Sequence, residues 1–106
     1  MVIEWLRIKV APEAREKYIQ KDAEIWTPML TRYPGFLGKE VWLNPEKADE
    51  VVLIIRWRTR QEWSSVPIED ITETEKQFDE AMGDTSHQIV ESLEYQVRKF
   101  PQGRNL

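Results

Sequence analysis

Apolar and polar positions alternate over the first ten residues, which is typical of a β-strand. The even-numbered positions form one mostly apolar face that contains a single acid: Val2, Glu4, Leu6, Ile8 and Val10. The odd-numbered positions carry Ile3 and Trp5 together with two cations. Because both faces of this strand are partly apolar, we expect something to cover each of them.

The spacing becomes helical after Pro12, which is tolerated in the first turn of a helix. One face of the expected helix collects the large side chains: Ala14, Tyr18, Ile25, Trp26, Met29 and Tyr33. We expect this helix to end at about Arg32. Pro28 removes one backbone hydrogen bond, so a kink or break is expected near residues 24–27.

Two further strands follow the turn Tyr33-Pro34-Gly35, over residues 36–44 and 50–58. Strict alternation in the first of them puts three side chains on one face: Phe36, Glu40 and Trp42. The second contains the run Val51-Val52-Leu53-Ile54-Ile55, which is apolar on both faces. Such a run belongs in the middle of a sheet.

The second half of the chain repeats the order of helix and strand. Residues 59–66 predict a short helical turn, and Ser65 and Pro67 open a second long helix. Its inward stripe is Ile71, Thr74, Glu75, Phe78 and Met82, and Gly83 is expected to stop it. A last strand is expected over residues 89–99, ending at Phe100-Pro101, and residues 102–106 should fray.

The order β-α-β-β-α-β predicts an α+β, ferredoxin-like fold, with two helices on one face of a four-stranded antiparallel sheet. A chain of 106 residues fits one domain, which we expect over residues 1–101. The strands are apolar on both faces, so the sheet face without helices is expected to meet a second copy. The sequence therefore predicts a homodimer through the open face of the sheet.

Composition narrows the classes of function. The net charge of −4 provides no field for neutralising phosphates, which argues against nucleic acid as a partner. There is no cysteine and one histidine, so we expect no metal site. No run is long and apolar enough for a membrane span, and the N-terminus does not resemble a signal peptide. We expect a cytoplasmic protein.

The stretches IIRWRTRQEW and YPGFLG resemble parts of the antibiotic biosynthesis monooxygenase-like family of dimeric α/β-barrel proteins. In residues 54–63 (IIRWRTRQEW), Trp57, Thr59 and Trp63 match that family's spacing at the end of its third strand, and residues 33–38 (YPGFLG) match its turn into the second strand. The whole sequence is similar to a small group of uncharacterised cyanobacterial members. The resemblance implies a ligand cavity between helices and sheet, and the activity of a monooxygenase that needs no cofactor.

The chain departs from that family at several positions. Val66 stands where the family often has a histidine three residues after the second aromatic. Heme-degrading relatives resemble one another in an asparagine on the first strand and a histidine on the second helix. This chain has no asparagine in Val2–Val10 and no histidine in residues 70–82.

Three residues are candidates for acid-base chemistry. Asp22 shares a helix face with Tyr18 and Trp26, so a desolvated carboxylate beside aromatic rings would act as a base. A bond to a strand arginine or to solvent is its ordinary alternative. Glu4 is a second candidate base, and a cross-strand ion pair with Arg56 or Arg98 is the ordinary alternative for it. His87 is the only histidine, and histidine is the residue type best suited to carry protons at physiological pH. A solvated loop position is its ordinary alternative.

Four aromatic residues are the candidate ligand contacts: Tyr18, Trp26, Trp63 and Phe78. Core and interface packing is the alternative explanation for each. The charged residues Arg56, Arg58 and Arg60 are interpreted as a solvated face. Three functions stay open: an oxygenase acting on an aromatic or apolar substrate, a non-catalytic ligand-binding or sensing module, and a heme-binding protein.

Overall fold

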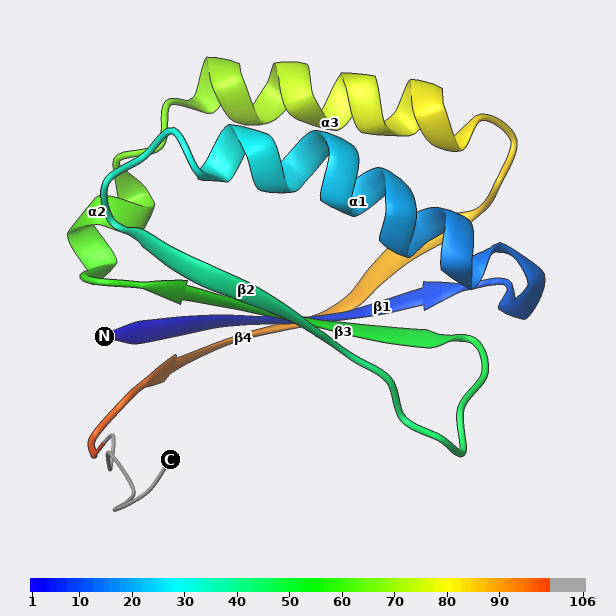
Figure 1. Cartoon of the computed structure of the whole chain (residues 1–106), viewed down its shortest axis with the longest axis horizontal. Coiled ribbons are helices and arrows are strands. Elements are labelled where there is room, and N and C mark those ends of the chain that lie inside the picture. The colour runs from blue at the N-terminus through cyan, green and yellow to red at the C-terminus, as the bar shows by residue number, and fades with distance from the viewer. Residues whose placement is uncertain (100–106) are drawn as a thin grey trace.

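The computed structural model describes residues 1–99 and has the predicted ferredoxin-like order of elements (Figure 1). The strands are β1 (Val2–Val10), β2 (Phe36–Trp42), β3 (Glu50–Trp57) and β4 (His87–Gln96). The helices are the 3-10 turn η1 (Pro12–Ala14), α1 (Arg15–Leu30), α2 (Arg60–Ser64) and α3 (Ile68–Met82). The predicted strand end at Phe100-Pro101 and the tail 102–106 lie outside the described residues.

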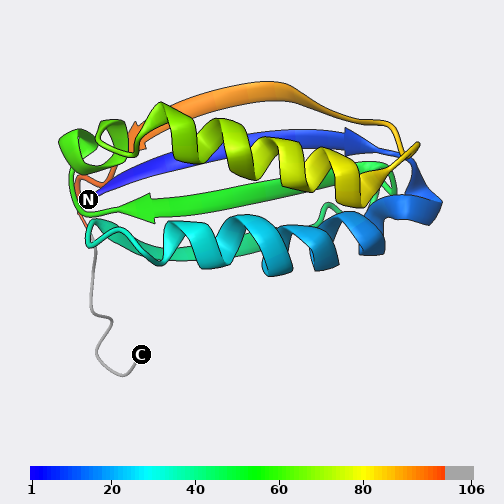
Figure 2. The ribbon, with the colours of Figure 1, turned by 90° about the horizontal axis from the view of Figure 1, so that it is seen from above.

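The four strands form one antiparallel sheet in the order β2-β3-β1-β4. The apolar strand β3 is central, as its sequence predicts. Helices α1 and α3 lie side by side on one face of this sheet, and no described helix covers the other face (Figures 1 and 2). This arrangement confirms the predicted fold class. We call the sheet face covered by α1 and α3 the helix face, and the opposite sheet face the open face.

The core is divided between these two faces. On the helix face, side chains of β1 and β3 pack against both long helices in two clusters, which include Ile8, Val51, Phe78 and Met82 in one, and Ile55, Trp57 and Met29 in the other. On the open face, Ile3, Val52 and Ile54 form a smaller cluster with Trp5. The predicted division of β1 into an even and an odd face is confirmed.

The predicted faces of β2 are wrong because the strand contains a β-bulge. Its register with β3 shifts between Phe36, which pairs with Trp57, and Gly38, which pairs with Arg56. The extra residue places Phe36 and Lys39 on the helix face, whereas Glu40 and Trp42 point to the open face. Gly38 has φ 152°, a backbone conformation that favours glycine.

Several predicted boundaries also need correction, including those of β2 and β3, which end at Trp42 and Trp57. Helix α1 continues through Pro28 to Leu30 without the expected break and ends before Arg32. Pro28 stands in the last turn, so it removes only one hydrogen bond near an end that frays anyway. Strand β4 begins at His87 and ends at Gln96, because these residues pair with Val10 and Val2, the two ends of β1.

Candidate functional site

A cavity of about 1120 Å³ lies between the helices and the sheet. Its floor is apolar and comes from β1 and β3: Leu6, Leu53, Ile55 and Trp57. Its walls carry aromatic side chains from α1, α2 and α3: Tyr18, Trp26, Trp63 and Phe78. All four predicted ligand contacts therefore line one space, and their binding role stays a prediction.

Two charged side chains stand on opposite sides of this floor. Glu4 pairs across to Ile55, and Ile55 pairs across to Lys39, so the three residues form a row over β1, β3 and β2 on the helix face. Neighbouring strands lie about 4.8 Å apart, so the Cα atoms of Glu4 and Lys39 are separated by roughly 10 Å. Ile55 forms an apolar surface between them.

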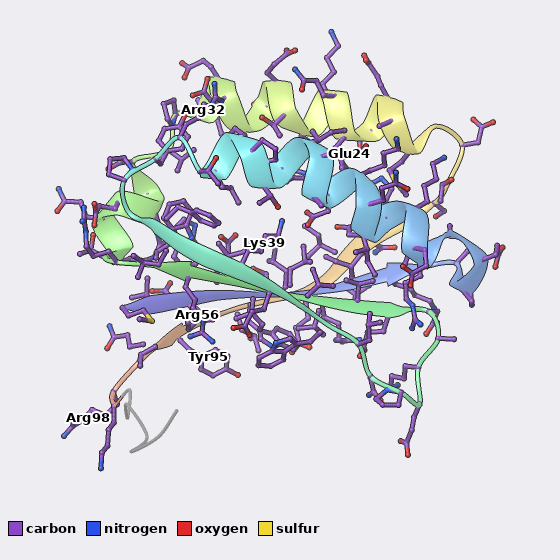
Figure 3. All side chains as sticks on the ribbon, viewed as in Figure 1. Glu24, Arg32, Lys39, Arg56, Tyr95 and Arg98 are labelled. Carbon is purple, nitrogen blue, oxygen red and sulfur yellow. The ribbon has the colours of Figure 1, made fainter. Side chains whose placement is uncertain are left out.

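Lys39 forms a buried ion pair with Asp22. Its Nζ donates to Oδ1 of Asp22 at 2.6 Å, and the two side chains are only 5% and 3% exposed. Figure 3 shows Lys39 rising from β2 toward α1. Burial raises the pKa of Asp22, and the ammonium of Lys39 opposes that rise. Among the described residues, Asp22 is the one side chain that accepts a hydrogen bond from Lys39.

Glu4 is partly buried, and no cationic side chain contacts it among the described residues. The indole N–H of Trp57 donates to its Oε1 at 3.3 Å. Burial raises the pKa of Glu4, whereas this hydrogen bond and the charges of Lys39 and Arg60 act in the opposite direction. The expected ion pair with Arg56 is absent, because Arg56 lies on the open face and donates to Glu40 at 3.5 Å (Figure 3). No bond to Arg98 is found among the described residues either.

The raised pKa of Glu4 gives a testable dependence of stability on pH. A folded state that holds this proton more tightly than the unfolded chain is stabilised at low pH, below the ordinary pKa of 4.5. That contribution is lost as the pH rises through the folded-state pKa. Replacing Glu4 by Gln removes the titration, so we expect the stability of Glu4→Gln relative to wild type to increase with pH. Urea denaturation between pH 4 and pH 8 measures the free energy of unfolding of both proteins. If it changed with pH equally in both, the partial burial of this carboxyl group would be contradicted.

Arg60 and Trp63 form the end of the cavity at α2. The guanidinium of Arg60 lies 3.9 Å from the centre of the Trp63 ring, a cation–π contact. Its Nε also donates to Glu94 of β4 at 3.1 Å. The interpretation of Arg60 as part of a solvated face is therefore incomplete, because this half-exposed residue also lines the cavity and joins α2 to the sheet.

Tyr18 lies near the middle of α1 with its ring inside the cavity wall. Burial raises the pKa of its phenol, and the negative charge of Asp22 raises it further. The phenol therefore stays neutral near pH 7. Its ring makes an edge-to-face contact with Phe78, with 5.1 Å between the centroids. These two residues join α1 to α3 above the sheet.

His87 lies at the other end of the cavity, in a strand and not in the expected loop. Its ring is 5.7 Å from Tyr18 and 5.2 Å from Phe78 between centroids, and its Nε2 is 3.4 Å from Oδ1 of Asp79. It pairs with Val10, six positions from Glu4 along β1, which is roughly 20 Å. The structure does not bring His87 together with Glu4.

Within residues 1–99, no group of three or more His, Cys, Asp or Glu side chains is arranged to hold a metal ion. In the same part of the chain, no helix is long and apolar enough to cross a membrane.

A ferredoxin-like sheet with an aromatic cavity under two helices, closed at one end by a short helix after β3, defines a class of small α+β proteins. Within it, this chain belongs to the antibiotic biosynthesis monooxygenase family, whose model matches residues 1–65. The predicted resemblance is thus confirmed for the family. The likeness to cyanobacterial members stays a prediction.

Solved structures share the fold at low sequence identity. SnoaB from Streptomyces nogalater, described as a cofactor-independent oxygenase, is 17% identical with a TM-score of 0.62, covering 93% of this chain and 94% of its own. A putative antibiotic biosynthesis monooxygenase from Bordetella bronchiseptica is 19% identical with a TM-score of 0.70, covering 91% and 95%. The heme-degrader MhuD from Mycobacterium tuberculosis, with two hemes in its active site, is 14% identical with a TM-score of 0.70, covering 95% and 99%. No curated protein matches the chain significantly.

Proposed function

We propose that the protein binds a planar aromatic molecule in its cavity and oxidises it with molecular oxygen, without a cofactor. The observation that carries this proposal is the partly buried carboxyl group of Glu4, which lines a cavity with an apolar floor and aromatic walls and has a raised pKa. A base whose pKa lies closer to neutrality is better suited to accept a proton from a weak carbon acid. Membership of the monooxygenase family supports the same reaction class.

The proposed reaction needs only a base, an apolar site and oxygen. Glu4 takes a proton from a substrate CH₂ group next to aromatic rings, and the aromatic walls hold the planar anion that remains. The anion transfers electrons to O₂ and a carbon–oxygen bond forms, and Glu4 returns its proton to the resulting peroxide. The O–O bond then breaks and water leaves with the second hydrogen of the former CH₂ group, which becomes C=O. The balance is CH₂ plus O₂ giving C=O plus H₂O, so the substrate itself is the reductant. Asp22 is less suited to be the base because Lys39 holds it in an ion pair.

Anthrone is a suitable probe because its CH₂ group lies between two aromatic rings and its product, anthraquinone, is easily identified. We expect wild-type protein to consume one O₂ per anthrone and to form anthraquinone faster than buffer alone. Binding of anthrone without faster oxygen uptake would leave the alternative, a non-catalytic ligand-binding or sensing module. Absence of binding would contradict both functions.

Heme is a poor fit to this cavity. His87 is the only histidine of the chain, and its Nε2 is directed to Asp79 while its ring packs between Tyr18 and Phe78. The cavity therefore presents no free imidazole to an iron atom. A saturable shift of the Soret band of hemin on titration with the protein would contradict this interpretation of the cavity.

We also propose that the open face of the sheet forms a homodimer interface. Trp42 and Tyr95 are 49% and 53% exposed, and they lie on the open face beside the cluster of Ile3, Val52 and Ile54. Exposed aromatic side chains beside an apolar cluster are typical of an interface between subunits. We therefore propose that the open face of one subunit packs against the open face of a second copy of the chain.

The substitution Trp42→Lys tests this interface. We expect it to convert the dimer to a monomer, because it replaces a large apolar side chain of the proposed contact by a charge on the edge strand β2. Light scattering after gel filtration measures the mass, and Lys76→Met, on the outer side of α3, is the control. A monomeric wild-type protein, or a dimer that survives Trp42→Lys and Tyr95→Lys together, would overturn the proposal.

A further inference from the structure

We propose that Lys39 determines which ligands the cavity accepts, by binding an ionised oxygen, a phenolate or an enolate, on a planar aromatic molecule. This inference rests on the proposed function, because it concerns the same cavity. It adds a substrate class, aromatic molecules with an acidic hydroxyl or an enolisable carbonyl group, and assigns the residue that selects it.

The position of Lys39 is the first argument. The bulge between Phe36 and Gly38 turns Lys39 to the helix face, on which β2 would otherwise present Glu40 and Trp42. Without the bulge, Lys39 would point to the open face. The fold therefore contains a local irregularity whose effect is to place one ammonium group inside an aromatic cavity, and bulges of this kind are over-represented beside active sites.

The energetics of the ion pair are the second argument. Lys39 and Asp22 are both almost fully buried, and removing two charges from water costs as much as their attraction returns, or more. A pair of apolar side chains of similar size would stabilise the fold at least as well. Stability alone therefore does not explain a lysine at this position, whereas recognition of an anion does.

The donors of Lys39 are the third argument. An ammonium group has three N–H donors, and one of them is directed to Asp22 at 2.6 Å. No other described side chain accepts from it, so two donors remain for a ligand oxygen or for water. Asp22 is then a positioning residue, because its hydrogen bond fixes where the amino group of Lys39 lies at the cavity wall.

The row across the sheet is the fourth argument. A planar ring lying on Ile55 has Lys39 at one side and Glu4 at the other. With a ligand oxygen on Lys39, the opposite edge of the ring faces the proposed base. The ammonium group then stabilises the negative charge that appears on this oxygen when Glu4 removes a proton.

Two coumarins test the inference without requiring turnover. 7-Hydroxycoumarin ionises with a change in absorbance, whereas 7-methoxycoumarin has the same ring system and cannot ionise at that position. An ammonium group in contact lowers the pKa of an acid by about one unit or more. We therefore expect the hydroxyl of bound 7-hydroxycoumarin to ionise at a pH lower by at least about one unit than that of the free compound.

The matched proteins are wild type, which keeps the ammonium group, and the double variant Asp22→Asn/Lys39→Met, which removes both charges of the pair so that neither is left buried alone. We expect the double variant to lose the shift of the hydroxyl pKa and to bind 7-hydroxycoumarin about tenfold more weakly than wild type, while the two proteins bind 7-methoxycoumarin within about twofold of each other. Lys39→Arg should retain the preference for the hydroxycoumarin, and Lys21→Met, at the exposed pair with Glu24, should behave as wild type.

The outcomes separate this inference from the proposed function. Equal binding of both coumarins by wild type and the double variant, with no shift of the hydroxyl pKa, would overturn the role of Lys39 and leave aromatic binding in place. Failure of wild-type protein to bind either coumarin would overturn the role of Lys39 and the binding function together. Circular dichroism of each variant confirms that it is folded.

Discussion

The substitution Glu4→Gln is expected to lower anthrone-dependent oxygen consumption at least about 100-fold, because a general base contributes roughly 10²–10⁴ to a rate. Gln keeps the size of the side chain and can still accept the hydrogen bond from the Trp57 indole, which measures 3.3 Å in the wild type. We expect its Kd for 7-methoxycoumarin to stay within about twofold of wild type. Oxygen-electrode rates and fluorescence titration measure the two quantities.

The pH dependence distinguishes a base from a binding residue. Because the pKa of Glu4 is raised, the wild-type rate should increase with pH as Glu4 loses its proton and then level off. The residual rate of Glu4→Gln should lack this step. The control Glu24→Gln removes an exposed carboxylate on α1 and should leave the rate unchanged. A Glu4→Gln rate within threefold of wild type would remove Glu4 from the reaction.

The substitution Lys39→Met alone is expected to destabilise the protein by about 3–5 kcal/mol, because it leaves the buried charge of Asp22 without a partner. The free energy of unfolding of the double variant Asp22→Leu/Lys39→Met should lie within about 1 kcal/mol of the wild-type value or above it, since this variant removes both charges. Urea denaturation at pH 7 measures the free energies of unfolding.

An exposed ion pair provides the control for this experiment. Lys21 and Glu24 are one turn apart on α1 and their side chains are 31% and 50% exposed. Lys21→Met should change the free energy of unfolding by less than about 1 kcal/mol. If Lys39→Met lowered the free energy of unfolding as little as Lys21→Met, Asp22 and Lys39 would not form a buried pair in solution.

The fold could be predicted from the sequence because each element carries its own periodicity. Alternation in Val2–Val10, the apolar run in Glu50–Trp57 and the helical spacing around Tyr18 and Phe78 all agree with one ferredoxin-like arrangement. Boundaries were less predictable. The ends of β4 depend on which residues of β1 it pairs with, and that pairing is a tertiary property.

The candidate site was only partly predictable. The helical spacing of Tyr18, Asp22 and Trp26 placed a carboxylate among aromatic rings, and all three line the cavity. Lys39 was missed, because strict alternation in β2 gives the wrong face once a bulge adds a residue. Gly38 inside a strand pattern was the available signal, since an isolated glycine there often marks a bulge.

The five tryptophans provide the most direct measurement of ligand binding to the cavity. Trp26, Trp57 and Trp63 line it, whereas Trp5 belongs to the open-face cluster and Trp42 also points to that face. In a titration of ¹⁵N-labelled protein with 7-hydroxycoumarin, we expect saturable shifts of the indole N–H signals of the first three and unchanged signals for Trp5 and Trp42. Shifts confined to Trp5 and Trp42, or no saturable shift at any of the five, would contradict an aromatic-binding cavity between the helices and the sheet.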